Sequence, residues 1–539
     1  MGASSSTDQK VSTEQREVET LAASTGALPM LHQAFSRLAD PQSNAVPLKS
    51  LQQCFCLAYE NLISEAPKMP DTFLVFLDNL SSSIVDVFFM PQKGGVSWVE
   101  FVRGYIKCCG RMSASMSLNT LLKVYAATVT KAGLPLKLEF ESDEADCKIN
   151  GSLLASDVHM LLWMCWTMSW DVRTSRSSKA KANLCLPDIS HLVLSAVTSC
   201  TEVGSGLNVW YCDVLGLEVQ LPVGKFLTWA IKTAPCLPDC LTQFVHARLQ
   251  NFRAAENECA SSSSSVGDLS STKTCSSFLL TRGRAWAISL TLRSTISEEI
   301  SQVCFPSTGD GTHENLLYQS SLHGRGLNRF WSNIEGYKGP LLMLISASSG
   351  DANESGTNLR KWIVGALMQN GFQNGDLFYG SSGCLYAISP VFHVLSSTGK
   401  DKNFVYSHLH ATGKIYEPKR KPVGIAFGGT MGNERIFVDE DFSRVTIRHH
   451  AIDKTYQPGS LFPDQGFLPV EALISEVEVW GFGGKRAKDV QHSYKKREEL
   501  FTEQRRRVDM KTFASWEDSP EKMMMDMISD PNAVRREDR

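Results

Sequence analysis

The sequence predicts an α+β protein of two domains, a helical N-terminal half followed by a C-terminal β-sandwich with flanking helices. In residues 18–253 apolar side chains recur at three- and four-residue spacing, which is the period of a helix that buries one face. After residue 275 the apolar runs become short, and turns rich in Gly, Asn and Asp separate them. A chain of 539 residues also exceeds what one hydrophobic core usually organises.

Three segments carry the clearest helical signals of the N-terminal half, which we expect to be all-α. Residues 118–125 hold Leu, Val and Tyr at helical spacing, and Gly133 and Pro135 then provide a stop. A further helix is expected to begin near Pro222, because proline suits a first helical turn. Residues 159–170 are too short an apolar run to span a bilayer and predict a buried helix.

Two segments of this half have the spacing of a calcium-binding loop with ligands missing. In residues 146–157, Asp146 and Asn150 offer oxygens at the first and fifth positions. Lys148 places a cation where a ligand is required, and Asp157 is shorter than the usual terminal Glu.

The second segment, residues 89–100, keeps the terminal Glu100 and a glycine at the turn. Its first, third and fifth positions offer no side-chain oxygen, being Phe89, Pro91 and Lys93. Both segments resemble degenerate EF-hand loops. Because calcium affinity follows the number of oxygen ligands, we expect an EF-hand-like scaffold without a metal site.

The first residues carry a candidate lipidation signal. Gly2 followed by Ser6 fits the N-myristoylation pattern, although a disordered Ser-rich leader over residues 1–17 with an incidental glycine is the alternative. One acyl chain binds a membrane only marginally, and neither a nearby cysteine nor a polybasic run assists it. We therefore expect peripheral membrane attachment that needs a protein partner.

Residues 254–274 (AAENECASSSSSVGDLSSTKT) predict a flexible linker, because they contain too few large apolar side chains to offset the entropy of ordering. The fifteen cysteines show no zinc-site or disulfide spacing, which favours reduced thiols in a cytoplasmic protein. A net charge of −3 gives no reason to expect a nucleic-acid partner.

Six short runs predict the strands of the second domain, residues 275–484. Several are apolar on both faces, which is typical of a sheet covered on both sides. The runs are residues 285–290, 341–345, 384–388, 423–427, 435–438 and 474–480.

Three collinear motifs in this domain resemble those of the TLDc family. The first is Leu316–Gly324 with Phe330 and residues 339–345, the second is Ala426–Gly429 with residues 435–442, and the third is Glu476–Gly481. The chain departs from the family pattern at residues 362–365 and at Thr430-Met431, which puts a shared active site in doubt more than the fold.

The whole layout resembles a subgroup of TLDc proteins with a myristoylated N-terminus and EF-hand-like helices. That resemblance implies binding to subunits of the vacuolar proton-pumping ATPase (V-ATPase), an association with TOR-pathway proteins at lysosomal or vacuolar membranes, and a link to oxidative stress resistance. It implies no cofactor.

Motifs of catalysis are missing from the second domain. Residues 379–384 lack the glycine spacing of a nucleophile elbow, and Gly428 and Gly429 lead into no phosphate-binding Lys-Ser/Thr. Four histidines lack metal-ligand spacing and are expected on strand surfaces; they are His408, His410, His449 and His450. We assign no catalytic residue and interpret Gly428 and Gly429 as structural or partner-binding positions.

Glu476 and Glu478 alternate along a strand and are expected on one face. Paired carboxylates can act as acid and base, but no nucleophile or metal ligand accompanies them, so a structural or partner-contacting role is favoured. The alternative is an oxidative-stress-protective enzyme that uses these carboxylates or a cysteine such as Cys384.

Residues 485–539 form a charged tail. Val490, Tyr494 and Phe501 make a thin apolar stripe at helical spacing, which fits either a solvated helix or a helix that docks into a partner's groove. The methionine-rich residues 523–528 offer adaptable side chains for a partner surface. The sequence thus predicts a non-enzymatic adaptor.

Overall fold

A computed structural model describes residues 12–65, 70, 72–90, 94–174, 183–201, 207–251, 278–305, 314–349, 360–409, 421–463 and 465–517, with residues 519, 522, 524, 525 and 528. The predicted acyl site at Gly2 and the linker over residues 254–274 lie outside these ranges. Within them, no helix combines the length and the apolar character needed to cross a bilayer.

Ten helices build the N-terminal part of the described chain. They are α1 (Thr13–Ser24), α2 (Leu28–Leu38), α3 (Leu48–Cys54), α4 (Thr72–Phe88), α5 (Trp98–Cys109), α6 (Ala114–Lys131), α7 (Ala155–Thr174), α8 (Ser190–Cys200), α9 (Val223–Thr233) and α10 (Asp239–Asn251), with a short 3-10 turn at Val214–Gly216. The three predicted helices are confirmed as α6, α7 and α9. Pro222 is the residue before the first turn of α9, and α7 is buried along most of its length.

Two small sheets interrupt this helical domain, so the all-α expectation is wrong in detail. Strands β1 (Leu62–Ser64) and β4 (Leu184–Leu186) pair in parallel, and β3 (Ile149–Leu154) lies between β2 (Lys137–Phe140) and β5 (Gln220–Pro222). These strands are three to six residues long, and hydrophobic periodicity is weak over such short segments.

The C-terminal domain is one curled sheet of eleven strands rather than a sandwich of two sheets. Its strands are β6 (Leu316–Gln319), β7 (Leu341–Ser349), β8 (Arg360–Met368), β9 (Gly375–Tyr379), β10 (Gly383–Ser389), β11 (His393–Ser396), β12 (Val405–His408), β13 (Gly424–Thr430), β14 (Asn433–Asp439), β15 (Arg444–Ile447) and β16 (Val470–Gly481). Their order is β11-β10-β8-β7-β16-β15-β14-β13-β12-β9, with β6 on β16. The long β16 joins the two halves, because its first residues pair with β15 and its later residues with β7 and β6.

Four helices accompany the sheet: α11 (Arg282–Ser289), α12 (Thr295–Cys304), α13 (Ser320–His323) and α14 (Leu327–Ile334). The expected strand at residues 285–290 is wrong, because these residues lie in and just after α11, whose first turn is capped by the Thr281 hydroxyl. The run is apolar on every side because α11 is buried on all faces, and a short uniformly apolar run does not distinguish helix from strand.

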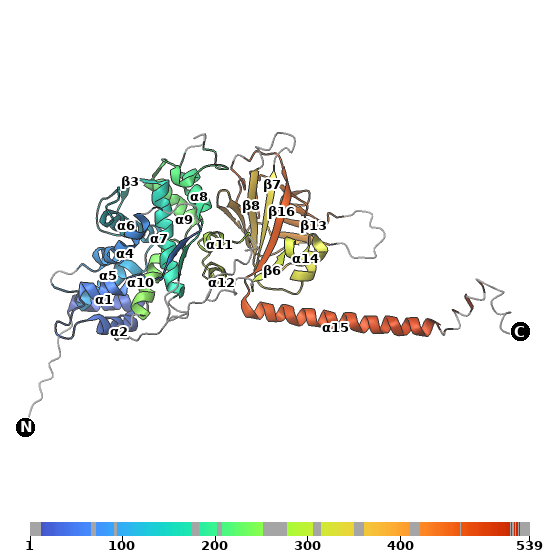
Figure 1. The fold of residues 1–539 in the computed structure, drawn as a ribbon, viewed down its shortest axis with the longest axis horizontal. Coiled ribbons are helices and arrows are strands. Elements are labelled where there is room, and N and C mark those ends of the chain that lie inside the picture. Colours follow the sequence, from blue (N-terminus) through green and yellow to red (C-terminus); the bar gives the residue numbers. More distant parts are fainter. Residues whose placement is uncertain are drawn as a thin grey trace, which may run out of the picture.

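The helices α11 and α12 lie between the helical domain and the sheet (Figure 1). One continuous hydrophobic core joins the helical domain, these two helices and the outer face of β7, β8, β10 and β16. A second core fills the inside of the curled sheet. The two domains therefore share a buried boundary over the described residues.

The last helix, α15 (Gly484–Glu517), leaves the sheet domain and projects away from it (Figure 1). It follows β16 after a turn of only two residues. The predicted charged tail thus begins as a long helix.

Candidate functional site

The loop over residues 89–100 has the predicted helix–loop–helix shape, since α4 ends at Phe88 and α5 begins at Trp98. Pro91 and Lys93 lie outside the described residues. Glu100 caps α5: its carboxylate accepts the Ser97 amide at 2.8 Å, and the Ser97 hydroxyl accepts the Glu100 amide. The carboxylate at the terminal position of the degenerate loop therefore stabilises a helix end.

A partner loop, which the sequence reasoning missed, faces this one. Val46 and Val96 exchange two backbone hydrogen bonds of 2.8 Å. Asn44 has φ +49°, which matches the left-handed Gly94 at φ +65° two residues before Val96. This loop has asparagine where an EF-hand loop has glycine, and it lacks an acidic residue at its last position. The EF-hand motif therefore could not be recognised there from the sequence.

The loop over residues 146–157 is entered from strand β2 and not from a helix, because α6 ends at Lys131. Gly151 is required there: a Cβ would lie 1.9 Å from the Lys137 carbonyl oxygen. Asp157 accepts the Leu154 amide at 2.8 Å, and the Asn150 amide donates to Glu141. Among the described residues, no group of three or more His, Cys, Asp or Glu side chains is arranged to hold a metal ion.

Gly428 and Gly429 sit at the end of β13 with φ +68° and +77°. A Cβ on Gly429 would lie 2.2 Å from the Asn433 carbonyl oxygen, and a Cβ on Gly428 would lie 3.0 Å from the Tyr456 ring. Both glycines are therefore required by the backbone of the β13–β14 turn.

Glu476 and Glu478 of β16 bind different segments. Glu476 accepts hydrogen bonds from the Ser320 hydroxyl at 2.5 Å and the Ser321 amide at 2.9 Å, which fixes the start of α13. Neither Glu476 nor Glu478 is among the described residues that line the cavities of about 470 Å³ and about 1060 Å³ elsewhere in the structure. The pair thus makes structural contacts in place of a shared acid–base centre.

Glu478 is completely buried and fastens the segment before α11 to the sheet. Its carboxylate accepts the Leu279 amide at 2.7 Å, the Leu280 amide at 3.3 Å and the Trp480 indole N–H at 2.8 Å. Burial raises the pKa of Glu478, and these three donors partly oppose that rise.

A buried ion pair inside the sheet was not predicted. Arg435 and Asp453 are both essentially inaccessible, and their side chains meet at 2.8 Å. Arg435 also donates to the Gln457 and Gly459 carbonyls, each at 2.6 Å. The only sequence signal was an arginine at the head of an otherwise apolar strand run.

His450 lies beside this pair, with its Nδ1 3.6 Å from the Asp453 carboxylate. The expectation of a surface histidine is therefore wrong for His450, which is buried. Burial alone would raise the pKa of Asp453, but hydrogen bonds from His450, Tyr456 and Thr455, with the Arg435 charge, hold it below its usual value.

Residues 289–483, which hold this sheet with its carboxylates, glycines and buried ion pair, match the sequence model of the TLDc domain. This part of the chain is a TLDc domain. Relatives include Oxidation resistance protein 1 of Rattus norvegicus, 26% identical over 168 residues, and that of Homo sapiens, 25% identical over the same length. The matches cover 31% of this chain and 16% of the relatives' own length.

The TLDc model begins at Ser289, the last residue of α11. In the structure the preceding residues 278–288 belong to the same unit, because Glu478 holds their first turn. Gly283 approaches the helical domain so closely that a Cβ would lie 2.1 Å from the Asp188 carbonyl oxygen. The α11–α12 hairpin therefore joins the TLDc domain to the helical domain.

Three further contacts tie that hairpin to the loop before α10. The Cys236 amide donates to the Leu290 carbonyl at 3.0 Å, its thiol donates to the Leu292 carbonyl at 3.3 Å, and the Arg293 guanidinium donates to the Pro235 carbonyl. On its other side the hairpin contacts the sheet through Thr291.

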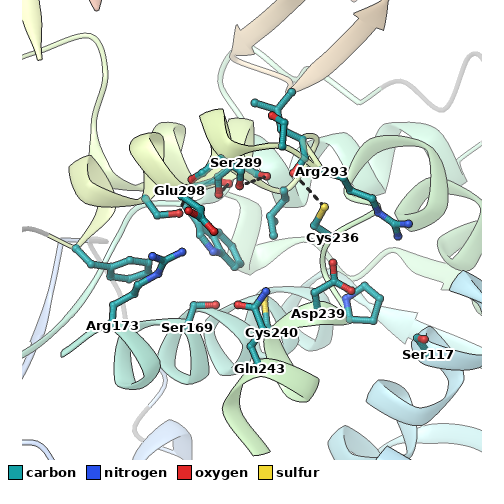
Figure 2. A pocket seen from close by; sticks show the side chains of 18 of the residues that line it. Ser117, Ser169, Arg173, Cys236, Asp239, Cys240, Gln243, Ser289, Arg293 and Glu298 are labelled. Atoms are coloured by element: carbon teal, nitrogen blue, oxygen red, sulfur yellow. Dashed lines mark hydrogen bonds between the residues drawn. The ribbon is translucent and has the colours of Figure 1, made fainter. Parts of the chain in front are cut away.

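A cavity of about 470 Å³ lies beneath this joint. Figure 2 shows Arg173 and Glu298 on one side of it and Asp239 with Arg293 on the other. Each side thus combines a charge of the helical domain with an opposite charge of the hairpin. Burial raises the pKa of the Cys236 thiol to about 11, which keeps it protonated at neutral pH.

Cys384, the cysteine considered for a redox role, lies on β10. Burial raises the pKa of its thiol, with hydrogen bonds partly opposing the rise. A reactive cysteine needs a stabilised thiolate, and this environment disfavours one.

The tail residues Tyr494 and Phe501 lie in different surroundings on α15. Tyr494 packs on Gly336 and donates its hydroxyl to Glu335 at 2.9 Å, so it binds α15 to its own domain. Gln491 and Lys495 support this contact by donating to the Asn333 carbonyl. Phe501 is 58% exposed.

Proposed function

We propose that this protein is a non-enzymatic adaptor that binds the V-ATPase, or a TOR-signalling complex, on the cytoplasmic side of lysosomal or vacuolar membranes. The TLDc domain and its similarity to Oxidation resistance protein 1 support a regulator of the TLDc family. Acylation at Gly2 would add a weak membrane contact.

The observation that carries the binding role is the exposed part of α15. The first turns of this helix are held by Gln491, Tyr494 and Lys495, whereas Leu500 and Phe501 are more than half exposed farther along it. A helix anchored at one end with uncovered apolar side chains at the other suits docking into a groove of a partner.

Replacing Phe501 with serine should reduce recovery of proton-pump subunits from lysosomal membrane extract by about tenfold, since a buried aromatic anchor contributes about 1.4 kcal/mol or more to binding. Thr502→Ser, at the next exposed position, is the matched control and should leave recovery unchanged. Truncation after Lys496 keeps the anchoring contacts and should act like Phe501→Ser. Equal recovery for all variants would remove the docking role of α15.

We infer that the helical domain derives from two EF-hand-like pairs that serve as a scaffold. The Val46–Val96 bridge supports the first pair, and the pairing of Leu153 in β3 with Leu221 in β5 supports the second. In both pairs a short antiparallel contact joins two loops that lead into helices.

Calorimetric titration of the full chain with calcium should give no saturable binding in the range of about 0.1–10 μM where cytosolic sensors respond. The reason is that Glu100 and Asp157 are engaged as helix caps, which leaves the loop over residues 146–157 with only Asp146 and Asn150 at its predicted ligand positions. A saturable micromolar isotherm would contradict the scaffold role.

The enzyme alternative is less favoured, because Ser320 and Ser321 donate hydrogen bonds to Glu476 and burial disfavours the thiolate of Cys384.

A further inference from the structure

A second cavity, of about 1060 Å³, lies between the helical domain and the TLDc domain. One wall is α9, and the other is β11 with the loop at Pro458. Its size is that of pockets for small molecules, roughly 300–1,000 Å³. We call it the α9–β11 cleft.

Among the described residues that line the α9–β11 cleft, the ionisable ones are Lys225, Lys232 and His393, and none is a carboxylate. The two lysines are seven residues apart on α9, which places them on one face of the helix. The cleft is therefore lined by cationic side chains in a chain whose net charge is −3.

The pKa of His393 indicates the electrostatic potential in the cleft. His393 is exposed on β11, but desolvation by the cleft around it lowers the pKa of its imidazole. Of the two cations that lower the pKa further, Lys232 lines the cleft and Arg435 is paired with Asp453. A site where a proton is disfavoured by neighbouring positive charge is a site where an anion is favoured.

The cleft also offers hydrogen-bond donors to a ligand. Ser199 and Ser396 add hydroxyl groups to the lining on either side, whereas the Thr228 hydroxyl on α9 already donates to the Gly224 carbonyl. At the start of α9, Gly224 has open space around it, so a ligand can approach the positive end of an eleven-residue helix.

The spacing of Lys225 and Lys232 and the size of the cleft indicate which class of anion would bind there. Seven residues along a helix correspond to about 10 Å, and the Lys225 ammonium is held at one end by the Cys200 carbonyl at 3.1 Å. The cleft of about 1060 Å³, with cationic side chains along one wall, has room for a ligand that carries several anionic groups. We propose that the α9–β11 cleft binds a multiply phosphorylated inositol, either free in solution or as the headgroup of a lipid.

Such a ligand would contact both domains at once. Binding would stabilise the pairing of α9 with β11, because a ligand that needs both walls binds only the joined arrangement. The cleft would thus couple the helical scaffold to the TLDc domain, a property separate from partner binding by α15.

The test is calorimetric titration of the full chain with inositol hexakisphosphate, alongside sedimentation with phosphatidylcholine vesicles that do or do not contain phosphatidylinositol 4,5-bisphosphate. We expect micromolar binding in at least one of these arms, the solution arm indicating a free ligand and the vesicle arm a lipid headgroup. Lys232→Glu should weaken binding about tenfold or more, since it removes a charged hydrogen bond.

Lys49→Glu is the matched control, because Lys49 is also exposed but lies on α3 outside the cleft. It should change affinity less than twofold, and the milder Lys225→Gln should weaken binding without reversing a charge. Thermal melts check that each variant is folded. As an independent readout, the ligand should raise the pKa of His393 measured by NMR.

Three results would overturn the proposal. The first is no binding in either arm. The second is an equal loss of affinity in Lys49→Glu and Lys232→Glu, which marks non-specific attraction. The third is binding that leaves the His393 titration unchanged, which places the anion elsewhere.

Discussion

Replacing Arg435 with alanine is expected to lower the free energy of unfolding by about 3–5 kcal/mol, the largest effect of any single change considered for the TLDc domain. The substitution leaves the Asp453 carboxylate buried without its 2.8 Å partner, and it removes the donors to the Gln457 and Gly459 carbonyls. Chemical denaturation followed by tryptophan fluorescence measures the change.

Arg444→Ala is the matched control, since Arg444 is exposed on the adjacent strand β15 and should change stability by less than about 0.5 kcal/mol. The double variant Arg435→Ala, Asp453→Ala should lose less than the sum of the two single losses, because neither charge is then left alone. If Arg435→Ala matched the control, the ion pair would not be a structural centre of the sheet.

Replacing Glu478 with alanine is expected to cost on the order of 3 kcal/mol and to loosen the joint between the domains. Three buried donors lose their acceptor: the amides of Leu279 and Leu280 and the indole of Trp480. Hydrogen exchange should therefore rise in residues 278–305 before it rises in the interior of the sheet.

Glu471→Ala, on the same strand but exposed, should leave that exchange unchanged. Glu478→Gln keeps one acceptor oxygen and should give an intermediate loss. Unchanged exchange in residues 278–305 for Glu478→Ala would show that apolar packing alone holds the hairpin.

Long elements with one clear period were predictable from the sequence. The helices α6, α7 and α9 follow from apolar spacing and from stop and start residues, and five of the six expected strands fall on observed strands. The sixth, at residues 285–290, was wrong because α11 lies between two domains and is apolar on every side. Periodicity carries no information where all faces are buried.

The roles of some candidate site residues could likewise be predicted from the sequence, and the roles of others could not. Gly429 could be recognised at a turn because Asn433, whose carbonyl it approaches, is close to it in sequence. The partners of Glu478 could not, because the Leu279 amide it binds lies 199 residues away in sequence. The same holds for Tyr494, which the helical stripe offered to an external partner and which packs on Gly336 of its own domain.

The sequence by itself determined the helical character of the first half, the β character of the second, the TLDc motifs and the loss of calcium ligands. Each of these depends on residue type and local spacing. Only the tertiary structure decided that the strands form one curled sheet, that α11 and α12 join the two domains, that Arg435 pairs with Asp453, and that Lys225, Lys232 and His393 share a cleft. Those features depend on contacts between segments far apart in the chain, and such contacts are set by the packing of the whole molecule and leave no periodic trace in the sequence.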